Sequence, residues 1–410
     1  MTDRTVPLGG AANEVHATGL HGRWETIPRD RRPDVAAIGV LTQREALTAA
    51  WGHAAASSLE TLITTRGQLD EWQRAQLQQD GFALDGAAPE CPRPPVPGRV
   101  WLLTSGSTGR PKRVAHTIDS LLTMRGERPP RRWLLPYSPG TYGWWQFVGM
   151  ALTMPGQDLV AVDADELAQW PRIALEHGVD AIAGTPTFWR AALLRDSVRL
   201  RTLPLTQVTL GGEPIGQDLL DALREVFPDA QLTWAYGSTE TGIALTVSDG
   251  RAGFPAAWLE RADSGRPQLR IQGDELLVRT AYAAENLAAR DNAGDGFWHT
   301  GDRVERVGDR IHITGRLDGD EINVGGAKVS ASAVRRVLTA HPDVFWAAVR
   351  AQPAPLVGQL VAADVVATPG SVIDIDAITA WCARRLPRHA VPRLIQALET
   401  VPMRENLKAQ

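Results

Sequence analysis

The feature that most constrains the fold is a loop that follows a buried strand. An apolar run at residues 100–103 predicts the strand, and six small or hydroxyl-bearing residues follow it. Small residues let a ligand approach the backbone, and successive N–H groups with hydroxyls bind anions. Arg110 and Lys112 add positive charge. We therefore predict a binding site for nucleotide phosphates, formed by Thr104, Ser105, Gly106, Ser107, Thr108, Gly109 and Lys112.

This loop differs from a Walker loop, in which G-x-x-x-x-G-K-[ST] leads into a helix. Here Pro111 lies between Gly109 and Lys112, and the chain continues as R-V-A-H-T in strand-like alternation. A Ser- and Gly-rich surface turn is the alternative interpretation of this stretch alone.

Apolar runs and helical patterns alternate over residues 132–236, which predicts an α/β domain with a largely parallel sheet. Ligands bind such sheets beyond the carboxyl ends of the strands, where the loops 211–214 and 237–242 are expected. Residues 265–312 predict a β subdomain, and the residues after a boundary near 316 predict a compact α+β unit. Residues 1–35 predict a lead-in without regular structure, and helical patterns cover 41–66 and about 69–79.

Composition argues against several classes of protein. The formal net charge of −4 gives no reason to expect a nucleic acid or an anionic membrane as partner. Cys91 and Cys382 have no metal-type spacing, and no segment reaches the roughly 18 consecutive apolar residues of a membrane span. The N-terminal sequence lacks the apolar core of a signal peptide. We expect a cytoplasmic protein and leave its oligomeric state open.

The loop T-S-G-S-T-G-R-P-K-R-V-A-H resembles the signature loop of the adenylate-forming superfamily, which contains acyl- and aryl-CoA synthetases, peptide-synthetase adenylation domains and luciferases. Further segments resemble its other signatures in the expected order. They are G-G-E-P-I at 211–215, Y-G-S-T-E-T-G at 236–242, W-H-T-G-D at 298–302, I-T-G-R-L-D at 313–318 and the C-terminal lysine segment.

The resemblance implies a large N-terminal α/β domain with mostly parallel sheets and a β subdomain, followed by a small mobile α+β domain. We expect these at residues 1–315 and 316–410, the second acting as a lid. About a hundred residues precede the signature loop, fewer than is usual in the superfamily. Residues 1–98 are therefore expected to form a lead-in and a shortened N-terminal subdomain.

The segment 236–242 offers groups suited to a magnesium nucleotide. Thr239 supplies a hydroxyl for phosphate, Glu240 a hard oxygen ligand for Mg²⁺, and Tyr236 an aromatic face for a purine. The resemblance implies the same roles, with Gly237 and Ser238 in the nucleotide site. A strand-to-loop turn with an incidental glutamate is the alternative.

Two further segments are assigned by the resemblance. Residues 211–214 are implied to line the adenine and acyl pockets, although a tight turn explains them as well; they are Gly211, Gly212, Glu213 and Pro214. A carboxylate at Asp302 can accept both ribose hydroxyls, and Arg316 is a second contact to ribose or phosphate.

The small domain carries the remaining assignments. Asp318 matches the hinge position, and the loop with Gly325, Gly326 and Lys328 is implied to meet the acyl acceptor, although its spacing from Arg316 is one residue longer than usual. The family ends with P-x-x-x-x-G-K, whose lysine orients the carboxylate and the α-phosphate. Lys408 fits that position, but Leu407 replaces the glycine, and a merely solvated lysine is the alternative.

An aromatic stretch at 137–147 stands where the family gates its acyl pocket. Tyr142, Trp144 and Trp145 are candidate pocket residues that suggest a short or flat acid, unless both indoles simply pack in the core. His116, directly after the phosphate loop, is expected to be structural rather than a catalytic base.

These features predict a ligase that uses ATP and Mg²⁺ to convert a carboxylic acid into an acyl-adenylate with release of pyrophosphate. A thiol, most simply that of coenzyme A, then takes the acyl group. The alternatives are another acceptor, such as an amine or a carrier protein, or an unusual acid in a specialised pathway. A third hypothesis is a nucleotide-binding regulatory protein without catalysis, against which the presence of Glu240, Asp302, Arg316 and Lys408 argues.

Overall fold

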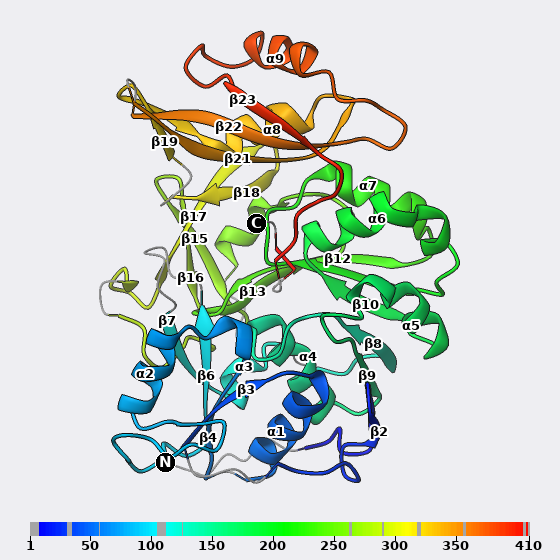
Figure 1. The fold of residues 1–410 in the computed structure, drawn as a ribbon, viewed down its shortest axis with the longest axis vertical. Helices are drawn as coiled ribbons and strands as arrows, with labels where there is room; N and C mark the ends of the chain where they lie inside the picture. Colours follow the sequence, from blue (N-terminus) through cyan, green and yellow to red (C-terminus); the bar gives the residue numbers. More distant parts are fainter. Residues whose placement is uncertain are drawn as a thin grey trace.

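The computed structural model describes residues 8–30, 35–56, 58–104, 112–124, 126–261, 265–288, 291–317, 321–355, 358–404 and 407–408. Within these residues four β-sheets form the framework, with helices packed around them. Figure 1 shows a small upper domain above a much larger lower one. This arrangement confirms the expected α/β fold with a large and a small domain. No helix in the described part of the chain is long and apolar enough to cross a membrane.

In the described part of the chain the largest sheet has eight strands, and its six central strands run parallel. The strand β10 (Ala181–Gly184) is buried throughout, as expected of a parallel sheet covered on both faces. The expected alternation is confirmed by β8 (Arg131–Leu135), α4 (Tyr142–Thr153), β9 (Gln157–Ala161), α5 (Trp170–Glu176), β10 (Ala181–Gly184), α6 (Pro186–Leu200), β11 (Gln207–Gly211), α7 (Gln217–Val226), β12 (Gln231–Ser238) and the antiparallel edge strand β13 (Gly242–Val247).

The N-terminal residues correct one expectation. Instead of an irregular lead-in, β1 (Glu14–Ala17) and β2 (Leu20–Arg23) form a hairpin at the far edge of the large sheet. β1 pairs in parallel with β9, about 140 residues away along the chain, and buries Val15 completely. Such a pairing depends on a distant partner strand, which local composition does not reveal.

The second sheet also corrects the expected helix at 41–66. The helix α1 (Gln43–Ala55) ends at Ala55, and E-T-L-I-T-T then forms the buried strand β4 (Glu60–Thr65). Its β-branched residues suit a strand, whereas the apolar spacing that continues past α1 is accidental. The expected second helix is confirmed as α2 (Glu71–Gln79). The other elements here are β3 (Val35–Val40), β5 (Ala83–Leu84), β6 (Arg99–Thr104), β7 (Lys112–Thr117) and α3 (Ile118–Leu121).

The expected β subdomain is confirmed as an antiparallel sheet that packs beside the large one. It contains β14 (Phe254–Pro255), β15 (Gln268–Gln272), β16 (Glu275–Arg279), β17 (Trp298–Val307) and β18 (Arg310–Arg316). The small domain follows with β19 (Glu321–Val324), β20 (Ala327–Ser330), α8 (Ala331–Thr339), β21 (Val344–Ala354), β22 (Gly358–Ala367), α9 (Ile375–Ala383) and β23 (Leu394–Leu398).

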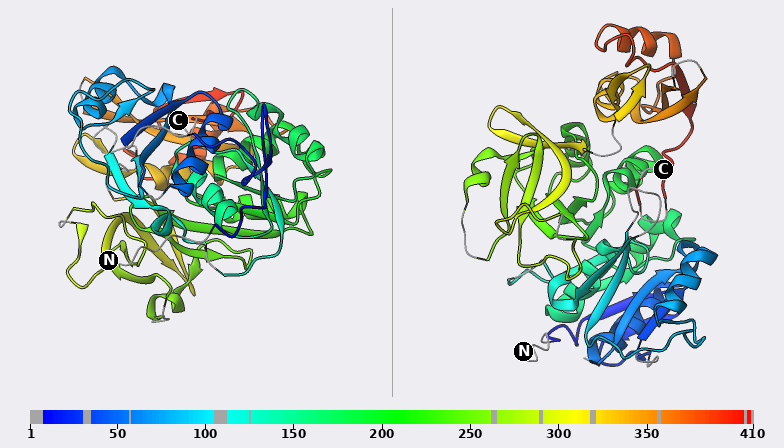
Figure 2. Two further views of the ribbon diagram at one scale, coloured as in Figure 1. Left: turned by 90° about the horizontal axis from the view of Figure 1, so that it is seen from below. Right: turned by 90° about the vertical axis from the view of Figure 1, so that its left-hand side faces the viewer.

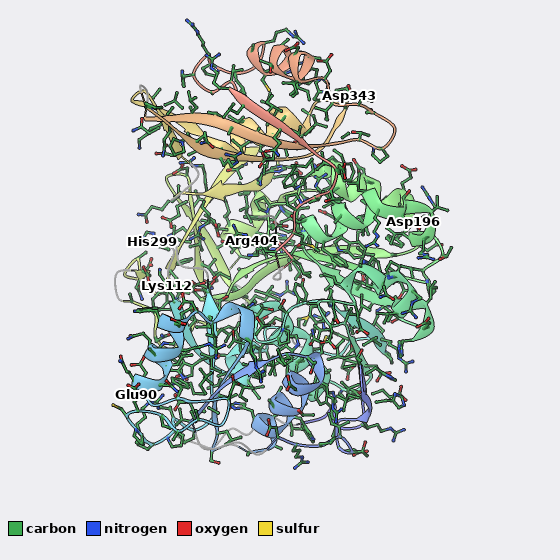
Figure 3. All side chains as sticks on the ribbon, in the orientation of Figure 1. Glu90, Lys112, Asp196, His299, Asp343 and Arg404 are labelled. Atoms are coloured by element: carbon green, nitrogen blue, oxygen red, sulfur yellow. The ribbon has the colours of Figure 1, made fainter. Side chains whose placement is uncertain are left out.

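After β23 the chain leaves the small domain and returns to the large one. Figure 1 shows this C-terminal tail as a red trace that descends towards β12 and β13, and the right-hand view of Figure 2 shows the red trace running beside the large domain. The labelled Arg404 accordingly lies below the strands of the small domain in Figure 3. The last described residues are therefore positioned by the large domain, although they follow the small one in sequence.

Candidate active site

The candidate site lies where three neighbouring parallel strands end. β10, β11 and β12 are paired in register, so that Gly184 lies opposite Leu210 and Gly211 opposite Ala235. Because parallel strands share the direction of their carboxyl ends, residues 185, 212 and 237–242 emerge at one edge of the sheet. That edge carries two of the predicted motifs, G-G-E-P and Y-G-S-T-E-T-G.

Lys408 reaches this edge from the other end of the chain. Gly212 has a φ of +84°, and a Cβ atom built on it would lie 3.4 Å from Lys408 Cε and 3.9 Å from Lys408 Nζ. The lysine side chain therefore passes over a glycine whose missing side chain gives it room. The structure brings Lys408 to the predicted adenine and acyl segment, and its catalytic role stays a prediction.

Asp302 is held by two side chains from different strands. The Tyr236 hydroxyl donates a hydrogen bond to one carboxylate oxygen at 2.6 Å, and Arg316 Nη1 lies 3.0 Å from the other. Burial, and then the negative charge of Asp302, raise the pKa of Tyr236 well above its ordinary value. The phenol thus stays a donor, and each carboxylate oxygen retains a lone pair that a ribose hydroxyl could use.

Most of the phosphate loop lies outside the described residues, whereas both strands that flank it are described. The predicted loop residues that are not described are Ser105, Gly106, Ser107, Thr108 and Gly109. Thr104 at the end of β6 pairs with Lys112 at the start of β7. The two strands that flank the loop therefore pair antiparallel, and a strand follows the loop, as predicted, rather than the helix that follows a Walker loop. Asp318, the predicted hinge, also lies outside the described residues.

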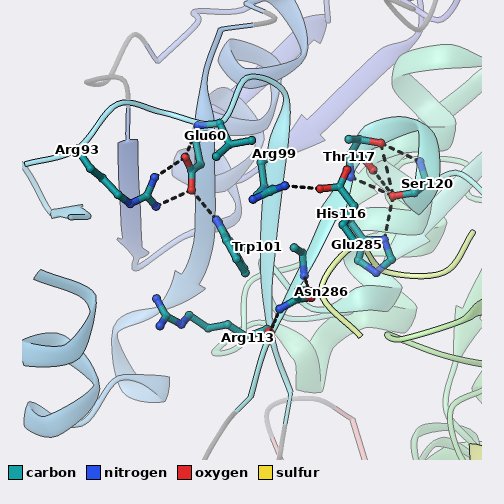
Figure 4. A network of polar contacts seen from close by, with 12 residues as sticks. Glu60, Arg93, Arg99, Trp101, Arg113, His116, Thr117, Ser120, Glu285 and Asn286 are labelled. Carbon is teal, nitrogen blue, oxygen red and sulfur yellow. Dashed lines mark hydrogen bonds and ion pairs between the residues drawn. The ribbon is translucent and has the colours of Figure 1, made fainter. Parts of the chain in front are cut away.

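A side chain of β7 contacts the backbone of the Y-G-S-T-E-T-G segment. Nε2 of the buried His116 lies 2.6 Å from the Thr239 carbonyl oxygen, and its Nδ1 lies 2.9 Å from Ser120 Oγ (Figure 4). Burial lowers the pKa of His116. A neutral imidazole that donates to Thr239 fits the expected structural role.

The segment 284–286 makes a second link between the same two motifs. The Ala284 N–H donates to the Glu240 carbonyl at 2.8 Å. The Asn286 side chain binds the backbone of β7 twice: its amide nitrogen donates to the Arg113 carbonyl, and its amide oxygen accepts from the Ala115 N–H (Figure 4). Thr239 and Glu240 are thus fixed through their backbones to the strand that leaves the phosphate loop.

Among the described residues, no group of three or more His, Cys, Asp or Glu side chains is placed to hold a metal ion. Mg²⁺ usually takes one or two carboxylates and completes its shell with substrate phosphates and water. Glu240 beside a nucleotide fits that pattern, and its metal role stays a prediction.

Glu213 and Thr185 show contacts that sequence reasoning missed. The carboxylate of Glu213 accepts from the Thr187 N–H at 2.9 Å and its hydroxyl at 3.0 Å, so it binds the N-terminus of α6. Thr185 caps the same helix by accepting from the Phe188 N–H at 3.1 Å, and its hydroxyl donates to the Leu407 carbonyl. A threonine directly before Pro186, at the end of a strand, is the signal that could have identified this cap.

The candidate acyl-pocket residues lie mostly in the core. The exposed fractions of Trp144 and Trp145 are 0% and 1%, and the Trp144 indole donates to Gln43 Oε1 at 2.8 Å. Core packing accounts for both indoles, so a pocket role is not needed to explain them. The Tyr142 hydroxyl is also buried, 3.6 Å from where a Cβ of Gly242 would lie. The pocket assignment stays a prediction, as does that of Gly211.

The predicted acceptor loop is the turn between β19 and β20. Gly325 and Gly326 have φ angles of +58° and +90°, which a two-residue hairpin of this type requires. Lys328 follows on β20, with its ammonium 2.8 Å from Glu321. The glycines are explained by the turn, and an acceptor role stays a prediction.

Comparisons with known proteins agree with this arrangement. The model of the AMP-binding enzyme family matches residues 27–272, and that of the AMP-binding enzyme C-terminal domain matches residues 334–408. A feruloyl-CoA synthase from Amycolatopsis sp is 31% identical over 269 residues, which cover 60% of this chain and 51% of that protein. The chain thus spans about half the length of that relative.

Solved structures share the fold. The amide bond synthetase McbA from Marinactinospora thermotolerans has a TM-score of 0.71 at 20% identity, covering 99% of this chain and 97% of that one. An anthranilate CoA ligase in complex with anthranoyl-AMP has a TM-score of 0.71 at 16% identity, and the match covers 99% of this chain and 94% of that one. Since the first family model spans more than half of the sequence, and the fold and the order of motifs agree with it, the chain belongs to the AMP-binding enzyme family, within the adenylate-forming superfamily.

Proposed function

We propose that the chain activates a carboxylic acid with ATP, releases pyrophosphate, and transfers the acyl group from the acyl-adenylate to a thiol, with coenzyme A as the first candidate. The observation that carries this proposal is the position of Lys408 over Gly212, at the sheet edge where the nucleotide motifs converge. A positive charge from a separate domain, delivered to that edge, suits a reaction between two anions.

The first half-reaction joins a carboxylate to the α-phosphorus of ATP. A carboxylate oxygen forms the new P–O bond while the bond to pyrophosphate breaks, and pyrophosphate leaves with the bonding electrons. Lys408 would hold the carboxylate and the α-phosphate together, and Asp302, with Tyr236, would hold the ribose. Positioning and charge neutralisation supply the acceleration, so the protein needs no covalent nucleophile. Bound Mg²⁺ would neutralise phosphate charge beside Glu240.

In the second half-reaction the acceptor sulfur forms a bond to the acyl carbon. The bond from that carbon to the AMP oxygen breaks, AMP leaves, and the thiol proton passes to solvent. Aromatic acids are the first substrate class to examine, because the relatives include a feruloyl-CoA synthase and a 4-chlorobenzoate–CoA ligase. An amine or a carrier protein as acceptor is the alternative.

The test is pyrophosphate release from ATP and Mg²⁺ with a panel of carboxylic acids that includes ferulate, 4-chlorobenzoate, anthranilate and short aliphatic acids. We expect acid-dependent release that Lys408→Ala abolishes. Coenzyme A is then added, and the product mass identifies the thioester. Release without a thioester would redirect the search to amines and carrier proteins, and no release with any acid would contradict the proposal.

A further inference from the structure

Leu407 occupies a conformation that glycine adopts more easily. Its φ is +64°, and among the described residues only Asp85 is another non-glycine residue with a positive φ. A γ-branched side chain is disfavoured in this left-handed region, because Cβ crowds the following carbonyl oxygen. A residue held there needs a compensating interaction.

The compensation comes from burial of the side chain. Leu407 has an exposed fraction of 0% and belongs to the core cluster of the large domain, together with Phe188, Leu210 and Trp234. These three residues come from α6, β11 and β12, the elements that form the candidate site. Leu407, three residues after Arg404 in the tail, thus joins the core of the large domain.

The backbone of the tail is held at the same place. The Thr185 hydroxyl donates to the Leu407 carbonyl, the Leu407 N–H donates to the Arg404 carbonyl at 2.9 Å, and the Arg404 N–H donates to the Lys408 carbonyl at 2.8 Å. These bonds hold Arg404, Leu407 and Lys408 close together. Leu407 points into the core while the exposed Lys408 lies over Gly212.

The rest of the tail bridges the two domains. Val401 is buried with Trp346 and Val366 of the small domain, in a cluster against which Leu194 of α6 packs. Met403 packs against the core that contains Leu407. The tail therefore has apolar contacts in both domains, and Leu407 is its fully buried contact in the large one.

We infer that Leu407 is a hydrophobic anchor that docks the tail in the large domain and so positions Lys408 for the first half-reaction. This inference rests on the proposed function for its catalytic consequence. A glycine would adopt this positive φ without strain but would bury no side chain in the large domain, whereas leucine accepts the strain and buries its side chain there. In the movement of the small domain that the family resemblance implies, the lysine would withdraw before the second half-reaction, and the anchor would oppose that release.

The test compares Leu407→Ala and Leu407→Gly with wild type in separate half-reactions under single-turnover conditions. Loss of a buried leucine corresponds to about a ten- to hundred-fold change in an equilibrium or rate. We expect a decrease of that size in adenylate formation for Leu407→Ala, and a smaller one for Leu407→Gly, since glycine relieves the strain. Transfer from preformed acyl-adenylate should be unchanged or faster in both.

Two controls separate anchoring from misfolding. Leu394→Ala removes a leucine of the small domain that is 51% exposed, and it should match wild type in both half-reactions. Leu407→Met keeps an apolar side chain of similar volume and should retain most of the adenylation rate. If Leu407→Ala does not fold, the anchor is tested by comparing the adenylation rates of Leu407→Met and Leu407→Gly. The anchor predicts a faster rate for Leu407→Met, and equal rates would contradict it.

Hydrogen exchange of the C-terminal peptide, followed by mass spectrometry without substrates, measures docking independently of activity. We expect faster exchange in Leu407→Ala and Leu407→Gly than in wild type. Adenylation and exchange at wild-type levels in both variants would overturn the anchor, and so would an equal loss in both half-reactions with unchanged exchange. A wild-type protein that activates no acid but shows this exchange difference would contradict the proposed function and leave the anchor standing.

Discussion

At the scale of single residues, Asp302 shows how the candidate ribose site is prepared before a nucleotide arrives. Tyr236 donates to it from β12, and Arg316, 58% exposed, pairs with it from β18. The exposed ion pair contributes little, so the buried phenol is the stronger support. The carboxylate is therefore oriented chiefly by a neutral donor.

Replacing Asp302 with Ala should raise the KM for ATP by about ten- to a hundred-fold, because hydrogen bonds to a charged group are worth about 1.5–3 kcal/mol each. Tyr236→Phe keeps the aromatic ring and should cause a smaller increase. Initial rates at varied ATP measure both, with the melting temperature as a check on folding. An unchanged KM in Asp302→Ala would remove the ribose assignment.

Glu240→Gln should abolish Mg²⁺-dependent adenylate formation and leave the fold intact, because it removes one charged oxygen ligand at the phosphates without changing the size of the side chain. The Glu240 carbonyl, which accepts from Ala284, is unaffected by the change. Pyrophosphate release across a Mg²⁺ titration is the measurement. Wild-type release at every Mg²⁺ concentration would show that this carboxylate does not serve the metal.

At the scale of elements, the tail after β23 is the segment on which catalysis should depend most. Lys408→Ala should decrease the first half-reaction strongly, since a positioned charge acting on the transition state is worth a few kcal/mol. Synthetic acyl-adenylate with acceptor should still give product at close to the wild-type rate. Equal losses in both steps would indicate a general phosphate contact, and no loss in either would mean that the lysine is only solvated.

The cap of α6 couples that tail to the large sheet. Thr185 is 2% exposed, and its hydroxyl both caps the helix and donates to Leu407. Thr185→Val should lower stability by about 1 kcal/mol through the lost cap and should also slow adenylate formation, whereas Thr185→Ser should restore both. Urea denaturation and the single-turnover adenylation rate are compared, and a loss of stability without a loss of rate would show that the cap does not position the tail.

At the scale of the whole molecule, buried histidines make the stability of the large domain depend on pH. His53 on α1 is 3% exposed, and burial lowers its pKa to about 4. Its Nδ1 lies 3.1 Å from Thr61 Oγ1 of β4, so it joins a helix to a strand. The native protein keeps this imidazole neutral in a pH range in which the unfolded chain binds a proton.

Above pH 6.5 His53 is neutral in both the native and the unfolded protein, so it does not make stability depend on pH. As the pH falls from 6.5 towards 4, only the unfolded chain binds the proton, and the free energy of unfolding decreases by up to about 1.4 kcal/mol per pH unit. Urea denaturation at pH 7 and pH 5 measures this change in the free energy of unfolding. Between these pH values we expect the free energy of unfolding to decrease less in His53→Gln than in wild type. An equal decrease in both proteins would assign the acid sensitivity to other groups.

The sequence by itself determined the fold class and the positions of the motifs. Alternating apolar runs identify the parallel strands, and the residues that follow them identify the sheet edge at which Gly212 and Thr239 lie. These are local patterns, because burial on both faces of a strand and the glycines of a tight approach leave a mark within a few residues. The spacing of Lys408 from Pro402 is likewise a local pattern that can be read within a few residues of sequence.

Only the tertiary structure decided how distant segments meet. It added β1 and β2 to the edge of the large sheet, ended α1 before β4, and placed Trp144 and Trp145 in the core. It also showed Thr185 bonding to Leu407, 222 residues away along the chain. Contacts across such separations depend on which surfaces pack together, and the leucine that looked like a departure from a glycine motif is explained only by the core that receives it.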